Sequence, residues 1–175
     1  MFASLPILST LIWLPIIGGL LVLVLKNISV DATKWLSLVI SIIAFVASVV
    51  LAYEFDSSRY QMQFYENISW IPAFDIYYSL GVDGISVPLI ILTTIISVLV
   101  IVAGWDVAKE RISEYFASFL ILEGLMIGVF CALDSILFYV FFEGMLIPMF
   151  LIIGIWGGPR RVYATIKFFL YTFFG

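Results

Sequence analysis

The stretch ILFYVFFEGMLIPMFLIIGIW, which runs from Ile136 to Trp156, decides the fold of this chain. Its residues are apolar, aromatic or small, with the exception of one carboxylic acid, Glu143. It has the length of a helix that crosses the hydrocarbon core of a bilayer, which takes about 20 residues. The stretch therefore predicts a membrane-spanning helix with one ionisable group near its middle.

The composition of the whole chain agrees with this prediction. Of its 175 residues, 64% are hydrophobic and only 11% are charged, and the mean hydropathy is +1.21. A soluble domain averages about half apolar and about a quarter charged residues. Because so few charged side chains cannot cover a surface that faces water, we expect an integral protein of the lipid bilayer.

The composition also excludes several classes of function. The net charge of −4 leaves no basic footprint for nucleic acid. With one cysteine, Cys131, and no histidine, the chain cannot build a disulfide scaffold, a zinc site or a thiolate-ligated iron–sulfur cluster. It also lacks the common Gly-rich phosphate loops. We therefore expect this chain to hold no cofactor and no metal of its own.

Further apolar stretches reach the length of a membrane span, and another begins near Thr165 and is still apolar at Gly175. We predict an all-α polytopic membrane protein with five full transmembrane helices and the start of a sixth. We expect residues 1–175 to form a single membrane domain, the N-terminal part of a longer subunit that is cut within helix six. The other full spans are predicted at Leu5–Leu25, Trp35–Phe55, Ile85–Ala103 and Tyr115–Ala132.

Positive charges gather in alternate predicted loops. The loops after the first, third and fifth spans hold most of the Lys and Arg residues, whereas the long loop after the second span holds only Arg59. Because loops rich in Lys and Arg stay on the cytoplasmic or matrix side, we predict that the N-terminus lies outside. The residues that carry this bias are Lys26, Lys34, Lys109, Arg111, Arg160 and Arg161.

Local chemistry marks the boundaries between spans. Asp31, Asp83 and Asp134 lie where the N-caps of the second, third and fifth helices are expected, and a carboxylate there accepts free backbone N–H groups. The loop from Asp56 to Gly84 is rich in aromatic residues. This composition favours a position along the membrane interface.

Glu143 is the strongest functional candidate. A charge at mid-membrane depth costs about 2.5–3.5 kcal/mol even on the lenient insertion scale. Desolvation favours the neutral acid and a nearby cation favours the carboxylate, so a partner can switch its affinity for a proton. Pro148 lacks an N–H and leaves the carbonyl of Gly144 without its helical partner. The functional interpretation is favoured; the alternative is a carboxyl that only pairs two helices.

Glu123 lies near the middle of the predicted Tyr115–Ala132 span. Two mid-membrane carboxyls on successive helices indicate a proton path in which Glu123 is a relay; the alternative is a permanently protonated hydrogen-bonding group. Beside it, Gly124 and Gly128, continued by Ala132, predict a smooth strip for close helix packing.

Lys167 lies a few residues into the predicted sixth helix. A lysine near a helix end commonly extends its ammonium group to the membrane interface. Its functional alternative is an electrostatic partner or relay for the membrane carboxyls.

Longer runs carry a family resemblance. LMIGVFCALD (Leu125–Asp134) and LFYVFFEGMLIPMF (Leu137–Phe150) are followed by IGIWGGPRRVYATIKFFLYT (Ile153–Thr172), and GVDGIS (Gly81–Ser86) adds a further match. These runs resemble subunit M, called chain 4 in mitochondria, of proton-pumping NADH:quinone oxidoreductase, or respiratory complex I. The resemblance spans most of the chain and is weakest over the first two spans.

The resemblance implies a membrane-arm subunit of the antiporter-like type, which couples electron transfer from NADH to quinone to proton translocation. The family's helix-five glutamate corresponds to Glu143 and its helix-six lysine to Lys167, whereas Glu123 matches a glutamate of only some members. The expected partners are other membrane-arm subunits and the lipid bilayer, with flavin and iron–sulfur clusters in other subunits of the complex.

Two other functions stay open at this point. One is a subunit of a multi-subunit cation/proton antiporter, a class related to the same family; the other is a truncated, non-catalytic membrane protein. The expected location is the bacterial inner membrane, with the mitochondrial inner membrane as the alternative.

The charge bias gives a testable orientation. A cysteine at Ser58 should react with an impermeant thiol reagent added to the outside of sealed vesicles, whereas a cysteine at Ser113 should react only in inside-out vesicles. Mass spectrometry of the labelled chain measures both. The opposite pattern would reverse the orientation and, with it, the direction of any proton path.

Overall fold

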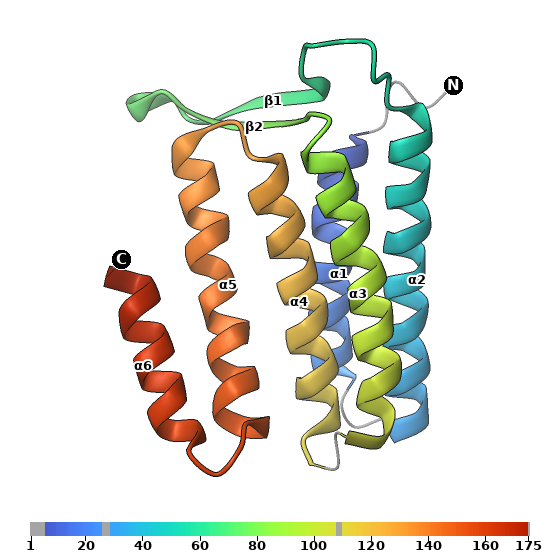
Figure 1. Ribbon diagram of the computed structural model, residues 1–175, viewed down its shortest axis with the longest axis vertical. Helices are drawn as coiled ribbons and strands as arrows, with labels where there is room; N and C mark the ends of the chain where they lie inside the picture. Colours follow the sequence, from blue (N-terminus) through green and yellow to red (C-terminus); the bar gives the residue numbers. More distant parts are fainter. Residues whose placement is uncertain (1–5, 26–28, 108–109, 175) are drawn as a thin grey trace.

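The structure is a computed structural model that describes residues 6–25, 29–107 and 110–174. The described residues form a helical bundle with a two-stranded antiparallel sheet across one end (Figure 1). Five of the helices are long and apolar enough to cross a membrane, as the sequence predicted. The helices are α1 (Ile7–Val24), α2 (Val30–Glu54), α3 (Ser86–Val107), α4 (Ile112–Cys131), α5 (Ser135–Trp156) and α6 (Arg161–Phe174); the strands are β1 (Gln63–Ile71) and β2 (Ile76–Val82).

Several helices begin before the apolar runs that predicted them. Helix α2 starts at Val30 rather than Trp35, and α6 starts at Arg161 rather than Thr165. A helix satisfies its own backbone groups, so it can continue through polar residues into the interface. Lys34 therefore lies inside α2 and Arg161 begins α6, which corrects their assignment to loops. Lys26 and Lys109 lie outside the described residues.

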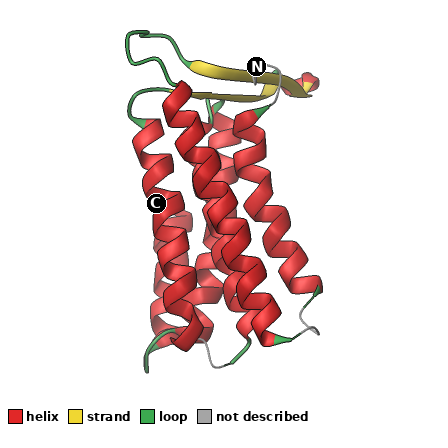
Figure 2. Cartoon of the chain, turned by 90° about the vertical axis from the view of Figure 1, so that its right-hand side faces the viewer, coloured by secondary structure: helices red, strands yellow, loops and turns green. Residues whose placement is uncertain are grey.

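The aromatic segment after α2 is a β-hairpin, which the prediction of an all-α chain missed. Its strands lie across the ends of the membrane helices (Figure 2). The register shifts between the pairs Gln63–Val82 and Glu66–Leu80, and Phe64 in this bulge has a left-handed φ of 54°. A bulge bends a strand and changes the direction of nearby side chains. Here, the next acidic side chain is Glu66, which contacts α1.

Glu66 caps the start of α1 from the hairpin. Its carboxylate accepts the N–H of Leu8 at 2.9 Å and the N–H of Ser9 at 3.3 Å, and it also accepts the hydroxyl of Ser9. The residue at the N-cap position itself, Pro6, supplies no side-chain cap. The first N–H groups of a helix have no partner within the helix, so this tertiary contact satisfies them.

Strand β2 is tied to the turn between α4 and α5. The backbone N–H of Leu133 donates to the carbonyl of Ser79 at 2.9 Å. Asp134 caps α5 by accepting the N–H groups of Ile136 at 2.8 Å and Leu137 at 3.1 Å. Hydrogen bonds from the backbone, first that of Leu137, hold the pKa of Asp134 below its ordinary value. The predicted cap at Asp134 is confirmed.

The other two predicted caps differ in outcome. Asp83 caps α3 by accepting the N–H of Ser86 at 2.7 Å, and this bond lowers the pKa of the Asp83 carboxyl. The prediction of Asp31 was wrong, because Ser29 is the N-cap of α2 and accepts the N–H of Ala32 at 3.2 Å. Asp31 instead lies in the first turn of α2, where its negative charge interacts favourably with the helix dipole.

Helix α4 is central to the bundle, because it packs against α1, α2, α3 and α5. Two apolar clusters form the core. The cluster toward the hairpin includes Ile127, and the cluster toward the opposite end includes Leu120. Both residues belong to α4, so the segment between them joins the two halves of the core.

The capping role of Glu66 can be tested by substitution. Glu66→Ala should destabilise the chain by about 0.5–2 kcal/mol, the usual range for a lost helix cap, because two backbone N–H groups lose their acceptor. Thermal unfolding in nanodiscs, followed by circular dichroism, measures the change. Glu54→Ala, at the exposed end of α2, is the matched control and should have little effect. Equal unfolding temperatures for the two variants would contradict the cap.

Candidate functional site

Two glycines fix the position of α4 against its neighbours. A methyl group at Gly124 would come within 2.5 Å of the carbonyl oxygen of Ile12 in α1, and one at Gly128 would come within 2.7 Å of the ring of Phe141 in α5. The predicted close-packing strip is therefore confirmed at both glycines, but it serves two different helices. It does not continue to Ala132, which lies beyond α4 and pairs with Leu80 of the hairpin.

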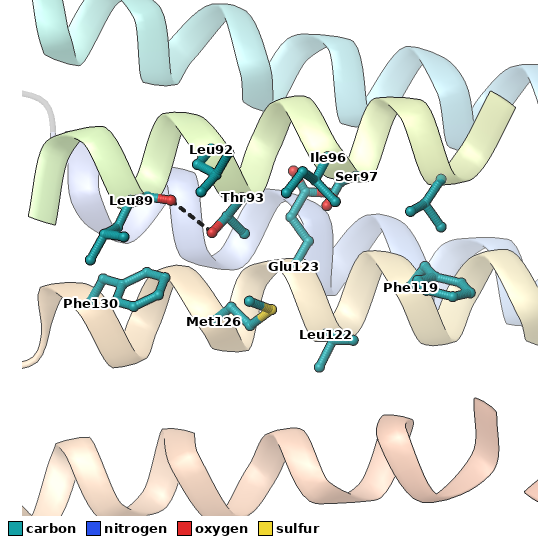
Figure 3. Close-up of a pocket in the computed structure, with 11 residues that line it drawn as sticks. Leu89, Leu92, Thr93, Ile96, Ser97, Phe119, Leu122, Glu123, Met126 and Phe130 are labelled. Carbon is teal, nitrogen blue, oxygen red and sulfur yellow. Dashed lines mark hydrogen bonds between the residues drawn. The ribbon is translucent and has the colours of Figure 1, made fainter. Parts of the chain in front are cut away.

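Glu123 is directed toward α3, a third neighbour of α4. Its side chain reaches between the two helices, with the carboxyl group beside Ile96 and Ser97 (Figure 3). The residue is 1% exposed. In the described part of the chain, neither of its carboxyl oxygens has a hydrogen-bond partner. A buried polar group without a partner is costly and requires an explanation.

A pocket surrounds the Glu123 side chain. Its volume is about 220 Å³, and it lies between α3 and α4. Two hydroxyl residues of α3, Thr93 and Ser97, line it together with Glu123. Thr93 donates its hydroxyl to the carbonyl of Leu89 at 2.8 Å (Figure 3). The remaining lining is apolar: Leu89, Leu92, Ile96, Val100, Phe119, Leu122, Met126 and Phe130.

Glu143 lies half-buried in α5. Its neighbour Gly144 faces α4, because a methyl group there would touch Leu125 at 3.4 Å. Helix α5 continues through Pro148, which is buried and lacks the N–H that the carbonyl of Gly144 would accept. Glu143 is thus adjacent to a backbone carbonyl with spare accepting capacity.

The two carboxyl residues lie at the same depth on successive antiparallel helices. Glu123 lies eight residues before Cys131, the end of α4, and Glu143 lies eight residues after Ser135, the start of α5. At 1.5 Å per residue, each is about 12 Å from the turn that joins the helices. No hydrogen bond between them is found in the described ranges, and Glu143 does not line the Glu123 pocket.

Lys167 lies deeper in α6 than predicted. Because α6 starts at Arg161, Lys167 is about 9 Å along the helix instead of close to its start. Its ammonium group lies 5.7 Å from the ring centres of both Tyr163 and Tyr171. These aromatic faces stabilise a cation. The side chain is exposed, and the structure does not bring it into the Glu123 pocket.

Sequence reasoning missed the two hydroxyl residues beside Glu123. Thr93 and Ser97 are four residues apart, a spacing that places two residues on one face of a helix. That signal was available within the apolar α3 span. The spacing of Thr93 and Ser97 could not show that they face Glu123, because the contact between α3 and α4 depends on packing elsewhere in the bundle. Among the described residues, no group of three or more Cys, Asp or Glu is placed to hold a metal ion.

These features define a polytopic membrane protein with ionisable groups inside its bundle, and comparison with known proteins identifies its family. Residues 10–132 match the sequence model described as NADH-ubiquinone oxidoreductase chain 4, amino terminus. Residues 132–175 match the model described as NADH:quinone oxidoreductase/Mrp antiporter, TM. The chain belongs to the NADH-ubiquinone oxidoreductase chain 4 family, which confirms the resemblance found in the sequence.

Individual relatives agree with this family. The chain is 47% identical over 173 residues to NADH-quinone oxidoreductase subunit M of Rhodobacter capsulatus. The aligned region covers 97% of this chain and 33% of that protein. The chain is 46% identical over 169 residues to NADH-ubiquinone oxidoreductase chain 4 of Arabidopsis thaliana, covering 96% and 34%. The chain thus spans about a third of the length of these curated relatives.

Two solved structures share the fold. A chain of respiratory complex I from Thermus thermophilus with bound NADH superimposes with a TM-score of 0.80 at 24% identity, covering 95% of this chain and 33% of the other. A chain of the archaeal membrane-bound sulfane sulfur reductase superimposes with a TM-score of 0.76 at 20% identity, covering 95% and 34%. At these identities the likeness establishes the helical membrane fold.

Proposed function

We propose that this chain is part of a membrane-arm subunit of a proton-translocating NADH:quinone oxidoreductase. The observation that carries the proposal is the family match, because the matched residues 10–132 include Glu123 and the matched residues 132–175 include Glu143 and Lys167. In this proposal residues 1–175 form a single membrane domain with the N-terminus outside. Its partners are other subunits of the membrane arm.

We assign proton transfer to Glu143. Intramembrane carboxyls are costly and mark proton relays. In a dry site the neutral acid is favoured, and an approaching cation makes release of the proton favourable. Glu123 is a second relay group at the same depth, and Lys167 supplies a positive charge on α6, the helix next to α5. The helices α5 and α6 that carry Glu143 and Lys167 pack against each other.

The oxidation of NADH and the reduction of quinone belong, in this proposal, to flavin and iron–sulfur clusters of other subunits. This chain contributes the proton path alone. We assign it to the bacterial inner membrane, because its relative from Rhodobacter capsulatus is a bacterial protein. The mitochondrial inner membrane is the alternative, which the relative from Arabidopsis thaliana supports.

Glu143→Gln in the assembled complex tests the proposal. The amide has nearly the same shape but cannot ionise, so the complex should assemble while proton translocation falls at least about tenfold, since loss of a proton-transfer group costs roughly 10²–10⁴-fold. Glu143→Asp keeps the acid and should retain part of the rate. Native gels check assembly, and NADH-driven ΔpH in membrane vesicles measures translocation.

The matched control for this experiment is Glu54→Gln, the same chemical change at an exposed helix end. It should translocate protons at the rate of the unmodified complex. An assembled Glu143→Gln complex that also reaches this rate would reduce Glu143 to a packing residue.

A cation/proton antiporter is the second candidate, because the family model over residues 132–175 covers both types of protein. The two functions differ in their driving force. An antiporter would exchange protons in vesicles without NADH when a sodium gradient is applied. Sodium-driven ΔpH of this kind, lost in Glu143→Gln, would favour the antiporter over the oxidoreductase subunit.

A further inference from the structure

We propose that Tyr163 and Tyr171 are positioning residues for Lys167, and that their rings hold its ammonium group in the charged form on α6. The inference rests on the role proposed for Lys167 in proton translocation and names the residues that fix its charge. Tyr163 lies four residues before Lys167, and Tyr171 lies four residues after it. We call these three residues the tyrosine clamp.

The first argument is the cost of a lysine at this position. Lys167 is about 9 Å from the start of α6, and residues 168–170, which follow it, are all apolar. A cation among lipid tails is costly without a partner. Both salt bridges found among the described residues join an arginine to a carboxylate, so no carboxylate of this part of the chain pairs with Lys167. Another kind of group therefore has to stabilise the charge.

The second argument is the geometry of the two rings. The Nζ atom of Lys167 lies 5.7 Å from the ring centre of Tyr163 and 5.7 Å from that of Tyr171. Both distances are within the limit of about 6 Å at which an aromatic face attracts a cation. Residues four apart are neighbours on a helix surface, so α6 itself brings the three side chains together. A lysine that extends to the interface would carry its ammonium group past Tyr163, whereas the equal distances place it between the rings.

The ring faces, rather than the hydroxyl groups, make the contact. A tyrosine oxygen can also accept a hydrogen bond from an ammonium group. In the described part of α6, however, the side chains that form hydrogen bonds are those of Arg161, Thr165 and Thr172, which all donate to backbone carbonyls. Replacement of both tyrosines by phenylalanine should therefore leave the clamp intact, and replacement by leucine should remove it.

The clamp lies on the side of α6 away from α5. Thr165 is 3% exposed and faces α5, because a methyl group at Gly154 would touch its hydroxyl oxygen at 3.5 Å. Lys167 is two residues further on, which is about 200° around the helix. Helix α6 lies beside α5 at the edge of the described bundle (Figure 1). The charge therefore acts on α5 across the width of α6, where a low dielectric weakens it less than water does.

Amine labelling in the assembled complex tests the proposal. Phenyl isothiocyanate enters membranes and reacts with a neutral amine but not with an ammonium group. Mass spectrometry measures the labelled fraction of Lys167, with Lys34 as an internal reference. In Tyr163→Leu with Tyr171→Leu, labelling of Lys167 should be at least about fivefold faster, because two rings that favour the ammonium group are lost. In Tyr163→Phe with Tyr171→Phe, labelling should keep the rate of the unmodified complex.

Proton translocation is measured in the same variants. NADH-driven ΔpH in membrane vesicles should fall at least about fivefold in the leucine pair, by the same loss of two ring faces, and should be kept in the phenylalanine pair. Native gels check that both complexes assemble. The single variant Tyr163→Leu keeps one ring and is milder, and it should label Lys167 at least about twofold faster. It decides the question if the leucine pair does not assemble.

The matched control is Tyr53→Leu, the same chemical change at a 91% exposed position of α2. It should leave labelling and translocation unchanged. Three results would overturn the proposal: labelling of Lys167 that does not change in the leucine variants, equally fast labelling in the leucine and phenylalanine pairs, or faster labelling with unchanged translocation. Because the labelling uses no NADH or quinone, it decides whether the clamp exists even if the translocation experiment on Glu143 fails.

Discussion

Hydrocarbon offers no hydrogen-bond partner to the backbone, and this constraint shapes the whole bundle. Within the spans, the helices satisfy their own groups. Their ends need outside partners, and on the hairpin side these come from acidic side chains: Glu66 for α1, Asp83 for α3 and Asp134 for α5. Glu66 belongs to strand β1, whereas Asp83 and Asp134 lie directly before the helices that they cap. Against this background of satisfied groups, the buried carboxyl of Glu123 and the indole N–H of Trp105 have no hydrogen-bond partner among the described residues.

Much of the fold could be predicted because its signals are local. Apolar runs of bilayer length predict the spans, and Asp83 and Asp134 stand directly before the helices that they cap. The cap of α1 could not be predicted, since Glu66 and Leu8 are far apart in the sequence. The hairpin was not predicted, because a bulge interrupts the regular alternation of inward and outward residues in its first strand. At α2, two capping residues occur within three positions, and the serine holds the N-cap.

The candidate site divides in the same way. Glu123, Glu143 and Lys167 could be found from the sequence, because an ionisable residue within an apolar span is rare and costly whatever its partner is. Which neighbour each one faces depends on packing. Gly124 brings α1 close to one side of α4, and Gly128 brings Phe141 of α5 close to another. The carboxyl of Glu123 is left to face α3, where Thr93 and Ser97 are its polar neighbours.

The separation of Glu123 from Glu143 has a consequence for proton transfer. Both lie about 12 Å below the turn between α4 and α5, yet the carboxyl of Glu123 is enclosed between α3 and α4. A proton cannot pass directly between groups that share no hydrogen bond, so a mobile carrier such as water has to connect them. An unbroken chain of exchanging groups would let protons flow back down their gradient. A subunit that translocates protons therefore needs a path that can be interrupted. Under the proposed function, the interval between Glu123 and Glu143 is the place for this interruption in the described part of the chain.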